Sequence, residues 1–217
     1  MSDPLAGELG AGALRLEAQL GEAVLLVERV GDAVLRPEPA EAVRLRQDGA
    51  RLKRGCRRIE VDLVSVAART APRGDDLRHV VALLQIAQHA ALIANQFGLI
   101  AEQLQAVDAS IHDRRGTAQK VSRMAFMAAA QLAGAVAALA RRERDRAPEL
   151  DREDDQLDQL NRGVFTAAHA LEVSPRRREL ALRHVLIARS LERVGDNSVK
   201  IAEQAALLAC APIEAGF

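Results

Sequence analysis

Apolar residues recur at helical spacing along almost the whole chain, and prolines and glycines divide this pattern into six segments. Segment 5–35 ends before Pro37 and Pro39, which cannot continue a helix. Segment 40–70 ends at a Pro-Arg-Gly turn. The residues expected to face the core are Leu14, Leu16, Leu20, Val24 and Val27 in the first segment, and Leu52, Ile59, Leu63 and Val66 in the second.

Four more helices are predicted after the turn at Pro72, in which Asp76 is a candidate N-cap. A polar connection at 113–116 separates the first of these helices from the second. Pro148 is placed to open the third, and Pro175 follows the capping residue Ser174 at the start of the last. The expected ranges are 77–111, 117–144, 148–171 and 175–209, with a loose tail at 212–217.

The two halves of the chain repeat one another. The pair Ile-Ala at 86–87 returns at 187–188, a shift of 101 residues, and the same shift relates Ile-Ala-Glu at 100–102 to 201–203. The pattern predicts an all-α fold of six helices in two pseudo-repeated three-helix bundles, covering residues 1–112 and 113–217.

Composition narrows the classes of function. The chain has 217 residues, 30 basic and 30 acidic, so its formal net charge is zero, and its aromatic content is 2%. Neither value favours a nucleic-acid partner or an acidic membrane surface. The apolar run 124–140, broken only by Gln131, is shorter than the ~20 residues of a bilayer span. We therefore expect a buried core helix and no direct membrane insertion.

Cellular location is inferred from targeting signals and cysteine usage. Residues 1–12 lack the basic start and apolar block of a signal peptide. The two cysteines, Cys56 and Cys210, have no metal or redox spacing and are expected to be reduced, buried thiols. These features predict a cytoplasmic protein.

The most informative stretch is 187–203, an amphipathic helix with an acidic pair. Glu192 and Asp196 are four residues apart and therefore lie on one side of the helix, where like charges repel by about 0.2–0.5 kcal/mol. A cation between them would reverse that repulsion. Gly195 costs roughly 1 kcal/mol against Ala in a helix and predicts the close approach of a second helix or an ion. The apolar face of this helix is formed by Ile187, Leu191, Val194 and Ile201.

A second acidic pair, Asp154 and Asp158, lies at the same spacing in the preceding helix. A short turn joins the two helices, so we expect them to be antiparallel neighbours whose acidic pairs converge. Four carboxylates would offer hard oxygen ligands to iron, manganese, magnesium or calcium, and with less preference to zinc. Without a cation, such acidic pairs are simply solvated helix faces.

Other charged motifs carry weaker hypotheses. The string Glu-Arg-Val-Gly-Asp at 28–32 nearly copies the key motif but has no acidic partner pair, and is interpreted as a solvated helix end. The arginine-rich stretches 141–146 and 176–178 are either solvated helix ends or a docking site for a partner. The five histidines are scattered and no Glu-x-x-His occurs, which argues against a ferritin-like oxidase. There is no phosphate-binding glycine loop and no nucleophile elbow, so no catalytic residue is predicted.

The string Leu-Glu-Arg-Val-Gly-Asp at 191–196, followed by Ile-Ala-Glu at 201–203, closely resembles the signature of the PhoU family. The segment 72–78, with a proline followed by Asp-Leu-Arg, is similar to the family's entry into its third helix. The resemblance implies a regulator, not an enzyme, that dampens phosphate uptake and the phosphate-starvation response. It implies contacts with the ATPase subunit of a phosphate ABC transporter and with a sensor histidine kinase, and a homodimer to which the Ala-rich run 124–140 also points.

The resemblance also implies a metal site. Members of this family hold multinuclear iron or zinc clusters with paired acid-x-x-x-Asp motifs. Carried over by position, the ligands here are Asp154, Asp158, Glu192 and Asp196.

The first half departs from this pattern. The positions equivalent to the family's first set of ligands hold Gly49, Lys53, Ala91 and Asn95. We therefore expect a metal ion or multinuclear cluster in the second repeat only. Two alternatives stay open at this point: a metal-dependent hydrolase or oxidase that activates water at the acidic cluster, and a metal-free helical scaffold.

Overall fold

The computed structural model describes residues 3–107, 111, 116–169 and 174–209. Its elements are six α-helices, and the described residues contain no strand. The all-α prediction with six helices is confirmed. The helices are α1 (Asp3–Leu35), α2 (Pro39–Thr70), α3 (Asp75–Gln105), α4 (Thr117–Arg141), α5 (Arg146–His169) and α6 (Pro175–Ala209).

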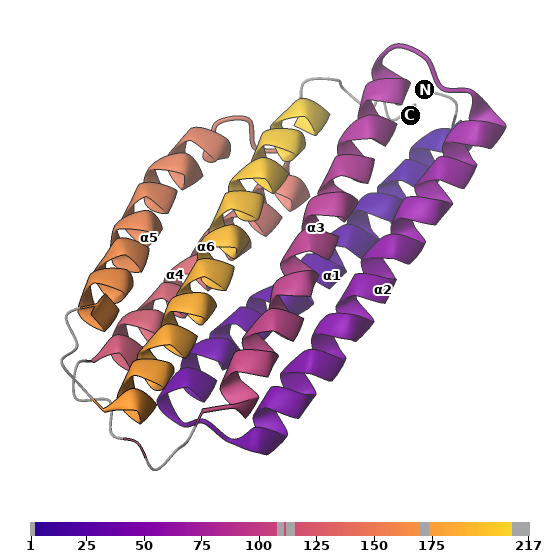
Figure 1. The fold of residues 1–217 in the computed structure, drawn as a ribbon. Coiled ribbons are helices and arrows are strands. Elements are labelled where there is room, and N and C mark those ends of the chain that lie inside the picture. Colours follow the sequence, from indigo (N-terminus) through magenta and orange to yellow (C-terminus); the bar gives the residue numbers. More distant parts are fainter. Residues whose placement is uncertain (1–2, 108–110, 112–115, 170–173, 210–217) are drawn as a thin grey trace.

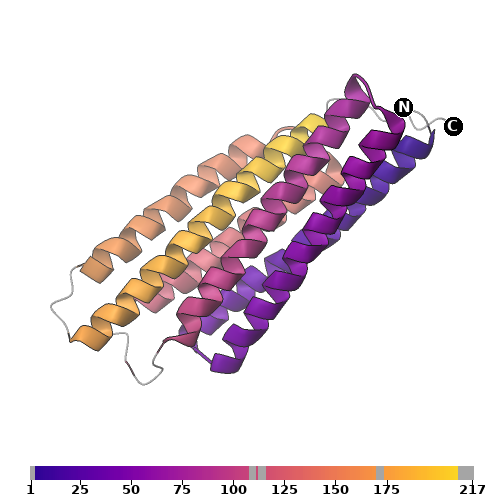
Figure 2. The same cartoon turned by 45° about the vertical axis from the view of Figure 1, so that its right-hand side comes forward.

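The helices lie roughly side by side along one direction, as Figures 1 and 2 show. Helices α1, α2 and α3 pack against one another, and α4, α5 and α6 form a second group of three. The groups meet where α3 packs on α6 and α1 packs on α4. One continuous apolar core therefore runs through both bundles. The division of the chain after residue 112 stays a prediction.

Two helices end earlier than the hydrophobic pattern predicts. Helix α4 ends at Arg141, not at 144, because Arg142 adopts a left-handed conformation with φ of 53° and donates its backbone N–H to Ala138 and Leu139. Helix α3 ends at Gln105, not at 111, and the N–H of Ala106 bonds to the carbonyls of Gln103 and Leu104. In both cases backbone geometry, not the end of the apolar pattern, terminates the helix.

Helices α3 and α5 each begin two residues earlier than predicted, and α1 and α2 begin slightly earlier as well. Asp76 is not an N-cap: Gly74, with φ of 57°, precedes the helix, and Asp75 and Asp76 lie in its first turn. Their carboxylates there suit the positive end of the helix dipole. Helix α5 begins at Arg146, which puts Pro148 inside its first turn, where a missing N–H costs no helical hydrogen bond. The predicted start of α6 at Pro175 is confirmed.

The predicted core faces are largely confirmed, with one correction on α1. Leu16, Leu20 and Val27 are fully buried, and the four positions predicted on α2 are buried as well. Leu14, however, is 66% exposed. It lies two positions before Leu16, which turns it by about 200° around the helix and away from the core.

Helix α4 is a core helix, as its alanine-rich sequence predicts. It packs on α5 and α6 within its own bundle and on α1 of the other bundle, and most of its apolar residues are buried. By length and composition alone, α3 and α4 could cross a membrane, although the run 124–140 by itself seemed too short. Half of each apolar window is buried inside the protein, and core helices commonly meet the same criteria. No location in the cell follows from these two helices.

Cys56 is a buried free thiol, as predicted. Burial raises its pKa to about 11, which keeps the thiol protonated and unreactive near neutral pH. Cys210 and the tail at 212–217 lie outside the described residues.

Candidate functional site

The helical register of α6 separates an apolar face from an acidic one. Ile187, Leu191, Val194 and Ile201 are all fully buried, which confirms the predicted apolar face. Glu192 is partly buried and Asp196 is exposed at the edge of the bundle. Helix α5 packs antiparallel beside α6 (Figure 1). Asp154 of α5 lies next to Gly195, so its acidic side chain is close to the acidic residues of α6.

Helix α5 approaches α6 closely at Gly195. A Cβ atom at this position would lie 2.5 Å from Oδ1 of Asp154, 2.6 Å from Cδ2 of Leu157 and 2.8 Å from Oε1 of Gln131. No side chain fits in that space without moving its neighbours. The close approach predicted from Gly195 is therefore confirmed, and the approaching element is a helix that carries one of the predicted ligands.

Asp154 is the most perturbed carboxyl group of the cluster. Its pKa is raised to about 6, first by burial and then by the negative charges of Asp196, Asp158 and Asp151. Gln131 acts in the opposite direction, because its Nε2 donates a hydrogen bond of 3.0 Å to Oδ1 of Asp154. A share of the Asp154 side chains is therefore protonated near neutral pH.

The pKa of Asp196, on α6, is affected by the same group of negative charges. Burial against its neighbours raises its pKa although one edge stays exposed, and the charges of Glu192 and Asp158 raise it further. A hydrogen bond with Asp154 and the positive charge of Arg189 act in the opposite direction. Asp154 and Asp196 thus approach one another across α5 and α6, and the charges of Asp158 and Glu192 act on them as well.

The cluster suits a cation in its chemistry but is not closed around one. Its donors are all carboxylate oxygens, and their mutual repulsion is the kind that a hard cation relieves. Yet across the residues that the structure describes, no three Asp, Glu, His or Cys side chains are grouped closely enough to hold a metal ion. Glu192 instead lies 3.7 Å from Nη1 of Arg189. Whether these carboxylates bind a metal thus stays a prediction.

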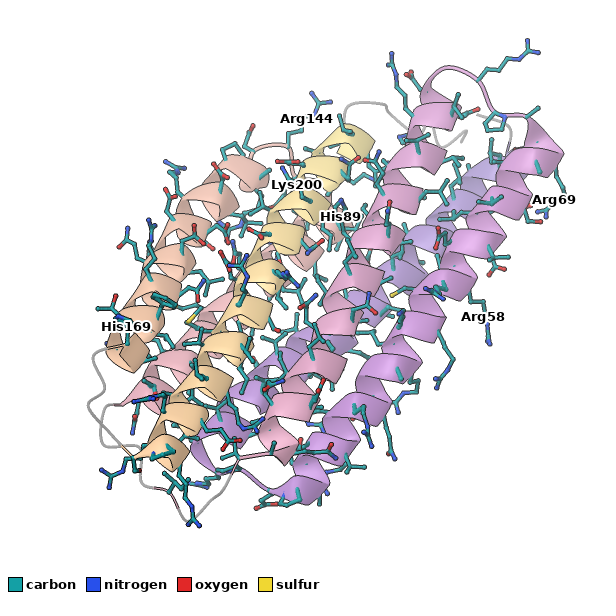
Figure 3. The ribbon with its side chains drawn as sticks, viewed as in Figure 1. Arg58, Arg69, His89, Arg144, His169 and Lys200 are labelled. Atoms are coloured by element: carbon teal, nitrogen blue, oxygen red, sulfur yellow. The ribbon has the colours of Figure 1, made fainter. Side chains whose placement is uncertain are left out.

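Sequence reasoning missed three residues at this site. Gln131 was visible as the one polar residue in the apolar run 124–140, and in the structure it is buried and donates to both Leu150 and Asp154. The negative charge of Asp151 adds to that around Asp154. Lys200 lies near the charges of Asp151 and Asp196, while its Nζ bonds to Glu203 at 2.8 Å (Figure 3).

In the first half of the chain, closely packed apolar residues fill the place that is equivalent to the acidic cluster. Gly49 is buried, and a Cβ there would lie 2.6 Å from Cβ of Phe97 and 3.2 Å from the carbonyl oxygen of Ala94. Phe97 itself is fully buried. A carboxylate at position 49 would meet this aromatic residue, so the loss of the acidic residue follows from close packing of α2 on α3.

The near-copy of the motif at 28–32 has a structural role, so its interpretation as a solvated helix end is wrong in part. Glu28 and Asp32 are exposed, but Arg29 donates hydrogen bonds of 2.8 Å to both Glu41 and Asp48 on α2. Gly31 is buried where α1 meets Ala125 and Phe126 of α4. The glycine permits helix contact here too, but with an apolar partner.

The stretch 141–146 also does more than solvate a helix end. Arg144 donates hydrogen bonds of 2.6 and 3.2 Å to the carbonyl oxygen of Ala209, at the negative end of the α6 dipole. Arg146 pairs with Glu149 at 2.6 Å and with Glu153 at 3.0 Å. The Arg144 contact fixes the loop between α4 and α5 against the end of α6, whereas the Arg146 pairs lie within α5.

Two histidines on α3 differ in their surroundings. Nδ1 of His89 lies 2.9 Å from Oδ1 of Asn197, which links the two bundles next to Asp196. His79 is buried, and neither of its ring nitrogens has a hydrogen-bond partner among the described residues. His79 therefore represents an uncompensated polar group in the core.

Comparisons with known proteins agree on one family. Residues 121–205 match the family model described as PhoU domain, and this segment contains all four predicted ligands. No curated protein matches the chain.

The solved structures that resemble nearly the whole chain include two PhoU proteins. The crystal structure of the phosphate transport system regulatory protein PhoU from Streptococcus pneumoniae has 16% identity and a TM-score of 0.84, covering 94% of this chain and 96% of that one. The crystal structure of PhoU from Pseudomonas aeruginosa has 22% identity and a TM-score of 0.74, covering 95% of each chain. At such identities the likeness establishes the fold.

Proposed function

We propose that this chain, which carries a PhoU domain at residues 121–205 and has the PhoU fold along its length, is a phosphate-transport regulator. It would dampen phosphate uptake and the phosphate-starvation response when phosphate is plentiful. The observation that carries the proposal is the match of the domain to the segment that holds the α5–α6 acidic cluster. The chain would act by binding other proteins, without catalysing a reaction.

The partners proposed are the ATPase subunit of a phosphate ABC transporter and a sensor histidine kinase, both met in the cytoplasm. A homodimer is also proposed. The run 124–140 supports a dimer less strongly than its sequence suggested, because most of the run is buried in the core. Its exposed residues are mainly Phe126, Ala130 and Ala133. Light scattering of the purified chain tests this point, and a monomeric mass at working concentration would contradict it.

A metal ion or multinuclear cluster, most plausibly of iron or zinc, is proposed for the second repeat. Asp154, Asp158, Glu192 and Asp196 would hold it, and the cation would offset the burial and the mutual repulsion that raise the pKa of Asp154 and Asp196. Metal analysis of the purified protein is the test. Replacing Glu192 and Asp196 together by Ala should abolish metal uptake and leave the helical fold intact. Metal content equal to that of the wild type would contradict the assignment.

The regulatory role is tested by deleting the gene in its host and following a phosphate-starvation reporter in phosphate-rich medium. The reporter should be switched on in the deletion strain and silenced again when the wild-type gene is returned. A reporter that stays silent in the deletion strain would contradict the role.

The Asn95→Ala variant serves as a control for the metal content of the cluster variants, because it alters the corresponding position of α3 without touching any predicted ligand.

A further inference from the structure

The facing ends of α5 and α6 present a second surface, away from the acidic cluster. Phe165 is 60% exposed and stacks on His169 with ring centroids 6.3 Å apart, and Leu182 is 56% exposed. Between the two helices lies a hollow of about 360 Å³. Figure 3 shows His169 at the end of α5, on the side of the molecule far from α2. The hollow is lined by Phe165, Ala168, His169, Arg178, Leu182 and Val185, with Ala181 beside them.

Arg178, in the first turn of α6, lines this hollow. Arg176 and Arg177 lie in the same turn, at other angles around the helix axis, so the three form a cluster of positive charge at the start of α6. Cations are unfavourable there, because a helix N-terminus already carries partial positive charge. None of the three forms an ion pair with another described residue, and the nearby Glu179 is already paired with Arg183. The arginines therefore oppose the helix dipole, and Phe165 and Leu182 are exposed beside them.

We propose that this surface, called here the α5–α6 end surface, binds an acidic segment of a partner protein. The segment would insert a large apolar side chain beside Phe165 and Leu182 and place a carboxylate against Arg178. Its other carboxylates would lie in the positive field of Arg176 and Arg177. Each carboxylate would gain from a guanidinium group and from the N-terminus of α6. Aromatic residues and arginines are also the side chains that most often dominate binding at protein interfaces.

The charge of the surface selects the occupant. A basic segment would be repelled by the arginines, and a purely apolar one would leave them unpaired at the rim of the contact. An acidic amphipathic segment would fill the hollow with an apolar side chain and pair its carboxylates with the arginines. The proposal goes beyond the regulatory role, and its test uses purified components, so that its failure is distinguishable from a failure of the phosphate phenotype.

The test measures binding of a fluorescent synthetic amphipathic peptide of leucine and glutamate to the full chain, by anisotropy. A matched peptide with lysine in place of glutamate is measured in parallel. The glutamate peptide should bind and the lysine peptide should not, and binding should weaken with added salt. Replacing Arg176, Arg177 and Arg178 together by Glu should weaken binding of the glutamate peptide by about tenfold or more, and Phe165→Ala should weaken it as well.

The charge-reversed variant should fold, because glutamates in the first turn suit the helix dipole, and circular dichroism verifies this. The matched control reverses three exposed arginines of α2, Arg54, Arg57 and Arg58, at the far edge of the molecule (Figure 3). It should leave peptide affinity within about twofold of the wild type, since these residues lie outside the contact.

Three results would overturn the proposal. The first is equal affinity for both peptides, or affinity unchanged in the arginine variant. The second is binding to phosphatidylglycerol vesicles, lost in the variants, without binding of the glutamate peptide, which would make the surface a lipid contact. The third is a dimer of the wild-type chain that Phe165→Ala converts to monomer, which would make it a contact between two copies.

Discussion

The side-chain amide of Gln131 donates a hydrogen bond of 3.0 Å to Oδ1 of Asp154, and this bond ties the buried helix α4 to the acidic cluster. The same amide nitrogen donates to the carbonyl oxygen of Leu150 at 3.1 Å. Through Gln131, the buried helix α4 therefore directly fixes the position of a predicted ligand.

Replacing Gln131 by Leu should destabilise the protein and raise the pKa of Asp154 above its present value of about 6. Two acceptors lose their donor, which typically costs about 1–3 kcal/mol for a buried group. Urea denaturation measures the stability, and NMR titration of the labelled carboxyl carbon measures the pKa. Gln156→Leu, at an exposed position of α5, should change neither quantity appreciably. An unchanged pKa of Asp154 in Gln131→Leu would show that the amide does not act on this carboxylate.

Asp154 should make the metal-free protein less stable as the pH rises. Its pKa in the folded chain, about 6, is higher than the 3.8 of an ordinary aspartate, so the folded state holds the proton more tightly. The stabilisation from this proton is fully present below about pH 4 and is lost as the pH rises through about 6. Asp154→Asn should therefore gain stability relative to the wild type between about pH 4 and pH 7, as measured by urea denaturation.

The exposed neighbour Asp155 provides the control for this pH dependence. Asp155→Asn removes the same charge from the same helix, outside the close contact with α6. Its stability relative to the wild type should vary little over this pH range. A pH profile for Asp154→Asn as flat as that of the control would contradict the raised pKa of Asp154.

Gly195→Ala should destabilise the protein even though alanine is the better helix former. The new Cβ would overlap Asp154, Leu157 and Gln131, and overpacking of this kind typically costs about 1–3 kcal/mol. Gly163→Ala in α5 is the matched control, because nothing lies within 4 Å of its Cβ position. That substitution should stabilise by about 0.4–1 kcal/mol. The midpoint of thermal unfolding should fall for Gly195→Ala and rise for Gly163→Ala. A higher midpoint for Gly195→Ala than for the wild type would refute the close approach of α5.

His79→Leu should stabilise the fold. The imidazole of His79 is 4% exposed, and neither of its nitrogens has a partner within the described residues, so an apolar side chain of similar size removes an uncompensated polar group. The gain expected is about 1–3 kcal/mol. His89→Leu is the contrasting variant, since it removes the hydrogen bond to Asn197 and should not stabilise. Equal effects of both variants on the unfolding midpoint would contradict this distinction.

The helices could be predicted because their pattern is local, whereas their ends and the details of the site depend on contacts between helices. The apolar period placed Leu16 and Leu20 in the core, but it did not separate them from Leu14 on the exposed side. Arg142 closes α4 through a left-handed turn that nothing in its side chain signals.

The acidic cluster shows the same division between local pattern and packing. The acidic pairs, each spaced by four residues, and the short turn between their helices predicted that the pairs would face one another, and the structure brings Asp154 close to Asp196. Gln131 was visible as a polar interruption, but its partner depends on how α4 packs on α5. Likewise, the absence of a carboxylate at Gly49 could be seen in the sequence, whereas its cause, the contact with Phe97, required the packing of α2 on α3.

The central claim, that this chain restrains phosphate transport, is tested most directly by the initial rate of radiolabelled phosphate uptake in phosphate-rich medium. Host cells lacking the gene should take up phosphate faster than wild-type cells, and the returned gene should restore the lower rate. An uptake rate that is the same with and without the protein would contradict the account.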